Sequence, residues 1–308
     1  MLGNLKLINF IFSFIFIISI IIGNAAASIF FGIIFAFFFK PSENFFSKRV
    51  GTIPLQIGIV LLGATISLPF ALKVTSDLMP WISLFVILSF LIGLFLGRVL
   101  RINKSLVYLI SSGAAICGAT AMAAIAPIIK AKPQELLIAM SIIFLLNTIA
   151  IFLFPIVGDY LKMTNFEFGA WSALAIHDTS SVVGSALVYS NESAQVAATL
   201  KLGRTIWLIP LILLTNWIFN KEIEVTKFPR FIVFFIIAIL ANAFLNPDEV
   251  ILDIIKITSK GFLIFGLLCI GSQFNFKELK TINSKPLMLA LALWVLVIPS
   301  SYLLVKYF

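Results

Sequence analysis

Residues 79–97 read MPWISLFVILSFLIGLFLG, and this run carries no charged side chain. A helix of about 20 apolar residues crosses the ~30 Å hydrocarbon core of a bilayer. The sequence therefore predicts an all-α polytopic membrane protein with about 10 or 11 transmembrane helices. Similar apolar runs recur along the whole chain, and we expect helices near residues 4–22, 25–39, 52–72, 79–100, 105–130, 135–157, 166–190, 195–219, 229–245, 254–276 and 286–307.

The composition of the chain supports this fold class. Of its 308 residues, 61% are hydrophobic and 11% are charged, whereas about a quarter of the residues in a soluble domain are charged. The connections between apolar runs are short, which predicts a single transmembrane transporter domain over residues 1–308. A second apolar run follows the first directly, so we interpret residues 5–22 as a membrane helix and not as a signal peptide.

The net charge of +9 is concentrated in the loops. With the N-terminus in the cytoplasm, most Lys and Arg residues fall on the cytoplasmic side, as the positive-inside rule requires. This predicts a multi-pass protein of the bacterial cytoplasmic (inner) membrane, in contact with the lipid bilayer. No nucleic-acid partner is expected, because no basic binding module is visible. Lys130 and Lys132 do not fit, because this topology places them outside. Either segment 105–130 does not cross simply, or these lysines extend to the interface.

A weak internal repeat links two distant segments. Residues 58–65, GIVLLGAT, resemble residues 266–273, GLLCIGSQ. In the expected topology the two segments run in opposite directions, and an inverted pair is typical of many secondary transporters. The alternative is chance, because small residues recur in membrane helices that pack closely.

Two segments interrupt the apolar pattern, and the first is SSGAAICGATAM at residues 111–122. Gly118 and the following Pro127 weaken a helix there. Freed backbone amides and carbonyls in an interrupted membrane helix can hold ions and substrates. We therefore expect Cys117, Gly118 and Thr120 to bind the substrate. The alternative is an unbroken helix of small residues that packs tightly.

The second segment, residues 177–181, places five consecutive polar residues inside an apolar run. A charged group in hydrocarbon costs a few kcal/mol, so it persists where it lines a cavity or takes part in function. We expect His177 or Asp178 to carry a coupling proton. The hydroxyls of the segment are expected to contact the substrate or a coupling cation: Thr179, Ser180 and Ser181. His177 is the only histidine of the chain, and a neutral histidine bonded between helices is the alternative.

Two cations, Lys201 and Arg204, lie in the next apolar run. They are three residues apart and share a helix face. A rise of ~1.5 Å per residue from a turn near residues 190–193 places Asp178 and Arg204 at a similar depth, near the bilayer midplane. A guanidinium suits oxyanions and carboxylates, so we predict a small anion bound by Arg204 and Lys201. The alternative for Arg204 is a structural ion pair with Asp178.

These residues resemble the YeiH family, also called uncharacterised family 0324 and named for sulfate export. The resemblance implies a relationship to bile acid and arsenite carriers, and hence a panel-and-core fold with inverted repeats and crossed, interrupted helices. In the expected topology, however, the two interrupted segments run parallel, whereas such crossed helices oppose each other. The resemblance spans about residues 50–280 and rests on residues 54–65, residues 112–121, His177-Asp178 (often His-Glu in the family), Lys201, Arg204 and Pro210.

The sequence thus predicts a secondary active transporter that exports a small inorganic or organic anion such as sulfate, sulfite or a sulfonate. Coupling to protons and coupling to sodium both remain open, as does a homodimer. An anion channel is the first alternative. An intramembrane enzyme is the second, because His177 and Ser181 are four residues apart, but a nucleophilic site also needs an orienting group and an oxyanion hole. We expect no enzyme activity, no cofactor and no metal site.

Overall fold

The computed structural model describes residues 2–41, 45–50, 52–219, 230–274 and 284–307. Throughout this part of the chain, the regular secondary structure is helical, as the sequence predicts. Many large apolar side chains, such as Phe10, Phe14 and Leu91, are exposed, which suits contact with lipid. The chain is therefore an all-α polytopic membrane protein. Five helices in the described residues are long and apolar enough to cross a membrane: Leu68–Val99, Pro133–Tyr160, Asn191–Ile218, Glu249–Ser272 and Ser284–Lys306.

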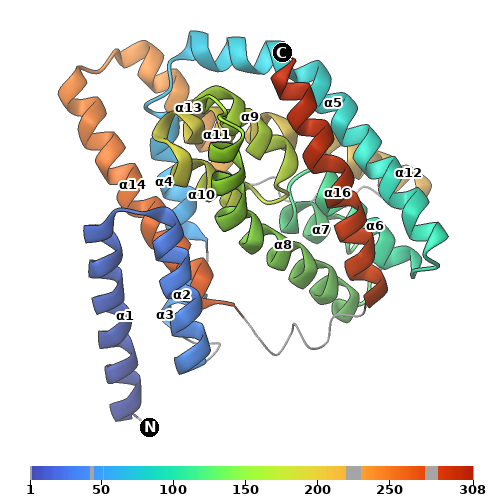
Figure 1. The fold of residues 1–308 in the computed structure, drawn as a ribbon, viewed down its shortest axis with the longest axis horizontal. Helices are drawn as coiled ribbons and strands as arrows, with labels where there is room; N and C mark the ends of the chain where they lie inside the picture. Colours follow the sequence, from blue (N-terminus) through green and yellow to red (C-terminus); the bar gives the residue numbers. More distant parts are fainter. Residues whose placement is uncertain (1, 42–44, 51, 220–229, 275–283, 308) are drawn as a thin grey trace. The chain divides into compact units, whose positions relative to one another are not determined.

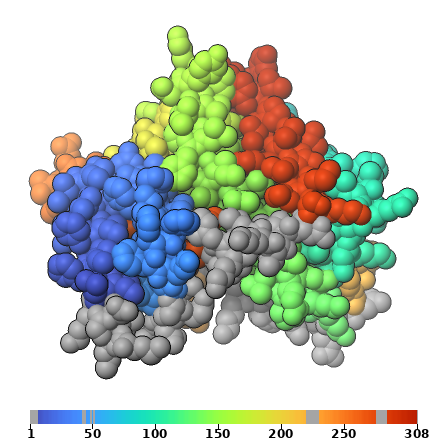
Figure 2. Space-filling view, turned by 60° about the horizontal axis from the view of Figure 1, so that its bottom comes forward, coloured from blue at the N-terminus to red at the C-terminus, as the bar shows by residue number. Residues whose placement is uncertain are grey.

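The chain divides into two compact units, each built from two separate stretches of sequence. The first unit comprises Met1–Phe70 and Arg230–Phe276, and the second comprises Ala71–Pro229 and Lys277–Phe308. In the first unit, α1 and α2 lie side by side (Figure 1), and their side chains form one continuous blue surface in Figure 2. The helices of this unit are α1 (Leu2–Ile22), α2 (Ala25–Phe39), α3 (Phe46–Val50), α4 (Ile53–Gly63), α13 (Arg230–Leu245) and α14 (Glu249–Ser272).

The two repeat segments lie against each other in the first unit. Gly58 of α4 is in close contact with Leu263 of α14, and Gly266 of α14 is in close contact with Leu55 of α4. The residue numbers rise along one helix as they fall along the other, so α4 and α14 run antiparallel. The expected topology assigns the same antiparallel orientation to the two segments. Glycine at both positions allows the backbones to approach closely.

The second unit contains the interrupted helices. Its last helix, α16, packs against α8 and α9, and Figure 2 shows it in red beside their light-green residues. The helices of this unit are α5 (Leu68–Val99), α6 (Lys104–Ala115), α7 (Ala119–Ile125), α8 (Pro133–Tyr160), α9 (Asn165–Ala175), α10 (Thr179–Tyr189), α11 (Asn191–Thr205), α12 (Leu208–Ile218) and α16 (Ser284–Lys306) (Figure 1).

The sequence predicts a loop between spans near residues 52–72 and 79–100, and this prediction is wrong. Helix α4 ends at Gly63, and α5 continues without a break for 32 residues. Two features explain the difference. Pro69 lies in the first turn of α5, where its missing N–H is no disadvantage. Lys73 and Asp77 are exposed and four residues apart, so both can lie on one solvated face of a helix that is longer than the hydrocarbon core.

Segment 105–130 forms a hairpin, although the sequence predicts a full span there. Helices α6 and α7 are separated at residues 116–118. Asn103, the N-cap of α6, donates from Nδ2 to Oε1 of Glu135 in the first turn of α8, at 2.8 Å. The chain thus enters both α6 and α8 from the same end of the second unit. The 12 residues of α6 rise about 18 Å, roughly half of a membrane span. We call α6–α7 hairpin 1.

Segment 166–190 forms a second hairpin from the other end, again in place of a predicted full span. Asn165, at the start of α9, donates from Nδ2 to Oε2 of Glu192 at the start of α11, at 2.9 Å. Tyr189, at the end of α10, donates its hydroxyl to the carbonyl of Met163. The chain therefore enters α9 and leaves α10 at one end. We call α9–α10 hairpin 2. The 28-residue α8 carries the chain from the first entrance to the second, so the hairpins enter from opposite ends.

The two hairpins remove both conflicts in the sequence-based topology. Because hairpin 1 returns to its own side, Lys130 and Lys132 lie at the same end as Arg101, and the positive-inside rule holds for them. The two interrupted segments also oppose each other, as an inverted repeat requires. The interruptions themselves fall where the sequence predicts them.

Single cysteines can test this topology in a background without Cys117 and Cys269. In intact cells, a membrane-impermeant maleimide is expected to label Asn191→Cys but neither Arg101→Cys nor Lys130→Cys. In inverted vesicles, the expected pattern is the reverse. All three positions are exposed in the structure. Labelling of Lys130→Cys from outside would contradict hairpin 1 and restore a full span over residues 105–130.

Candidate functional site

The tips of the two hairpins meet inside the second unit. Gly118 lies at the break of hairpin 1, and Asp178 lies at the break of hairpin 2. A Cβ added to Gly118 would lie only 3.2 Å from the Cβ of Asp178. The two polar segments that the sequence singles out, far apart in the chain, are therefore in contact.

The backbone at each tip has a local cause. Gly118 has a φ of +62° and a ψ of −126°, a combination that glycine adopts without steric cost. This turn lets the Gly118 N–H donate to the carbonyl of Gly113 at 2.8 Å, and α6 ends. At the other tip, the Asp178 carboxylate accepts from the backbone N–H groups of Ser180 and Ser181, at 3.0 and 3.3 Å. Asp178 is thus the N-cap of α10, a position that aspartate favours.

Arg204 joins the two hairpins through their backbone carbonyls. Its side chain is only 1% exposed, and no ion pair in the described residues links it to Asp178. The positive charge lies at the C-terminal ends of α6 and α9, where the helix dipoles are negative. The sequence predicts this guanidinium on an anion, and the structure places it on these carbonyls: Nε donates to Ala115 at 2.7 Å, Nη2 to Ala114 at 2.8 Å, and Nη1 to Leu174 at 2.7 Å and Ala173 at 3.1 Å.

Lys201 makes an equivalent contact with hairpin 2. Its Nζ donates to the carbonyl of Ile176, the C-cap of α9, at 2.8 Å, and its side chain is fully buried. Lys201 also interacts electrostatically with Arg204 and Asp178. Two buried cations therefore lie near one carboxylate, and the helix ends supply further negative partial charge.

His177 is fully buried beside this cluster. Its backbone N–H donates to Oδ1 of Asn147 on α8 at 3.3 Å. Among the described residues, neither imidazole nitrogen makes a hydrogen bond of good geometry, although the backbone of Ala114, at the end of α6, lies close enough to interact with the ring. Both the coupling role of His177 and the alternative of a neutral histidine held between helices therefore stay predictions.

The remaining predicted residues surround the tips with differing exposure. Cys117, Thr179 and Ser181 are buried, whereas Thr120 and Ser180 are partly exposed. The sequence missed the carbonyl groups that Arg204 and Lys201 bind, because no side-chain type marks a backbone acceptor. The amide of Asn147, a polar residue within the apolar α8, accepts from the backbone N–H of His177 and so helps to hold the tip of hairpin 2.

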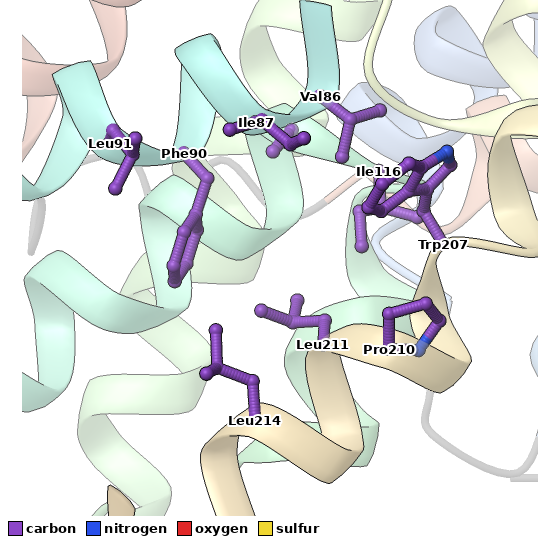
Figure 3. Close-up of a pocket in the computed structure, with 10 residues that line it drawn as sticks. Val86, Ile87, Phe90, Leu91, Ile116, Trp207, Pro210, Leu211 and Leu214 are labelled. Carbon is purple, nitrogen blue, oxygen red and sulfur yellow. The ribbon is translucent and has the colours of Figure 1, made fainter. Parts of the chain in front are cut away.

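A cavity of about 150 Å³ lies beside the tip of hairpin 1. Figure 3 shows Ile116, at the end of α6, and Trp207, after α11, on its wall. The one polar group among these side chains, the Trp207 indole N–H, donates to Oγ of Ser83 at 3.1 Å. The lining is otherwise apolar, so the cavity is unsuited to an anion. Its other residues are Val86, Ile87, Phe90, Leu91, Ala115, Pro210, Leu211 and Leu214.

Comparison with known proteins identifies relatives over almost the whole chain. The family model described as conserved hypothetical protein 698 matches residues 7–290. A UPF0324 membrane protein of Bacteroides thetaiotaomicron is 40% identical over 88% of this chain and 82% of its own length. A UPF0324 membrane protein of Vibrio parahaemolyticus is 36% identical over 97% of both chains. One of Shewanella oneidensis is 36% identical over 82% of this chain and 80% of its own. No solved structure matches.

Proposed function

Since this chain belongs to the UPF0324 membrane protein family, we propose that it is a secondary active transporter for a small anion in the bacterial inner membrane. The names of the relatives give a membrane location and no substrate. The proposal therefore rests on the chemistry of the site.

The observation that carries the proposal is the meeting of two hairpin tips that enter from opposite ends. Secondary transporters bind their substrates near the bilayer midplane, at discontinuous helices related by an inverted repeat. Irregular backbone at membrane depth is tolerated where it is buried in protein or lines a polar cavity. Hairpin 1 and hairpin 2 are discontinuous helices that enter from opposite ends, and their tips are in contact at Gly118 and Asp178.

The charges at the tips support an anion as the solute. Lys201 and Arg204 are both buried, whereas within the described residues Asp178 is the one carboxylate that interacts electrostatically with Lys201. An uncompensated buried charge is costly, and a bound anion would compensate it. The partly exposed hydroxyls of Thr120 and Ser180 can donate hydrogen bonds to such an anion. We propose sulfate, sulfite or a sulfonate as the substrate class and export as the direction.

Thermal unfolding of the purified protein tests the substrate class. The panel is sulfate, sulfite, thiosulfate, bicarbonate, methanesulfonate and acetate. An anion that binds only the folded protein, at about 100 times its Kd, stabilises it by about 2.7 kcal/mol. We expect a rise in unfolding temperature with one oxyanion class, and a smaller rise in the variant with Thr120→Val and Ser180→Ala. Thr258→Val, at an exposed position of α14, is the matched control. An unchanged unfolding temperature with every anion would refute the anion as substrate.

A further inference from the structure

Sodium-coupled carriers hold Na⁺ at unwound backbone carbonyls and at the C-terminal ends of interrupted helices. In this chain, the side chains of Lys201 and Arg204 occupy the C-terminal ends of α6 and α9. We propose that Lys201 and Arg204 take the place of a coupling cation, that the protein binds no sodium at these ends, and that the exchangeable proton of Lys201 is the coupling ion. The role of the proton as coupling ion rests on the proposed transport function. The claims that no sodium binds and that Lys201 exchanges a proton do not.

The contacts show that the carbonyl ends already hold cations. The carbonyl of Ile176, at the end of α9, receives the Lys201 ammonium at 2.8 Å. The carbonyls of Ala115 and Leu174 each receive a guanidinium N–H at 2.7 Å. A sodium ion needs several such oxygens at once. At these ends it would also meet two fixed positive charges, and like charges a few Å apart repel strongly in a low-dielectric interior.

Only one of the two cations can exchange a proton. A guanidinium stays protonated in proteins, whereas a lysine ammonium gives up its proton readily when it is buried. When Lys201 is deprotonated, one N–H bond breaks, its electron pair stays on Nζ, and the proton passes to bulk water. The neutral amine can still donate to Ile176 through a remaining N–H. One of the two positive charges is lost, so a bound anion is held less tightly. Protonation of Lys201 therefore strengthens binding of the anion, and a bound anion favours protonation of Lys201.

Other charged and titratable groups face Lys201 and are present throughout the test. Arg204 lies on the same helix, and Cys117 faces it from hairpin 1. Asp178 and His177 face it from hairpin 2. Their own titration contributes to any pH profile. The experiment therefore compares proteins that differ only at Lys201.

The sodium claim is tested on the purified full-length protein without any anion substrate. NaCl replaces KCl in steps up to about 200 mM, with the total salt constant. We expect the same unfolding temperature in both salts at each pH. A rise with sodium in the wild-type protein that Lys201→Arg abolishes would overturn the claim.

The proton claim is tested by following the unfolding temperature from about pH 5 to pH 9. The proteins are wild type, Lys201→Arg (always charged) and Lys201→Gln (never charged). Lys256→Gln, at an exposed lysine, is the control. We expect the wild-type curve to run parallel to both variant curves at low pH, where Lys201 is charged in the folded and in the unfolded protein. At higher pH the folded protein holds the neutral amine while the unfolded protein keeps the proton, so the wild-type unfolding temperature rises against both variants by about 3 °C per pH unit, the effect of one proton.

The proton claim would be overturned if the difference in unfolding temperature between wild type and each variant stayed constant, or changed at one constant rate, over the whole pH range. In either case Lys201 would never change charge in the folded protein. If Lys201→Gln fails to fold, the comparison with Lys201→Arg decides alone. No anion is present in either measurement. If no anion of the panel raises the unfolding temperature, both claims can still be tested. If an anion does raise it but the pH test contradicts the proton claim, the proposed carrier function stands and Lys201 is not its coupling group.

Discussion

Replacing Arg204 with Gln is expected to lower the unfolding temperature of the purified protein by about 10 °C. The guanidinium donates to four carbonyl groups, two at the end of α6 and two at the end of α9. A glutamine amide is shorter and cannot reach both helices. Removing one partner from a buried, charge-assisted network costs about 4 kcal/mol. Arg204→Lys keeps the charge but not the planar fork, so we expect an intermediate loss.

The control for this substitution is Arg98→Gln, which removes an exposed arginine in the last turn of α5. It is expected to leave the unfolding temperature unchanged within about 1 °C. The opposite outcome for Arg204→Gln is also informative. Normal stability together with a lost response to anions would mean that the guanidinium binds the solute directly, as the sequence predicts.

Replacing Gly118 with Ala is expected to disrupt the contact between the tips. A Cβ at this position would lie 3.2 Å from the Cβ of Asp178, and the backbone has a φ of +62°. A side chain in such a conformation costs about 2 kcal/mol. We expect a fall of about 5 °C in the unfolding temperature and a loss of at least about tenfold in anion affinity, because hairpin 1 must move.

The matched control for Gly118 is Gly203→Ala on α11. Its Cβ would meet Met79 at 3.8 Å, an ordinary contact, and its backbone is helical. Alanine is favoured over glycine in a helix by about 1 kcal/mol, so the variant should be as stable as the wild type or more stable. If Gly118→Ala behaves like Gly203→Ala in both stability and anion response, the tips do not need the close approach described above.

The sequence by itself determined the fold class and the places where helices break. Apolar runs such as residues 79–97 require a membrane, because burial of so many apolar side chains has no other solution in a chain with 11% charged residues. The breaks follow from local chemistry. Gly118 can adopt a positive φ, and Asp178 can cap the next helix with its own carboxylate. Both properties belong to single residues and their immediate neighbours.

Only the tertiary structure decided where the chain goes after each break and what the buried cations bind. A hairpin and a crossing helix have the same apolar pattern. Contacts between the starts of helices, such as Asn103 of α6 with Glu135 of α8, distinguish them. Two of the four acceptors of Arg204 are backbone carbonyls about ninety residues earlier in the chain, at Ala114 and Ala115. Every residue carries such a carbonyl. Its availability depends on where a helix ends and what packs against that end, and no side chain records either property.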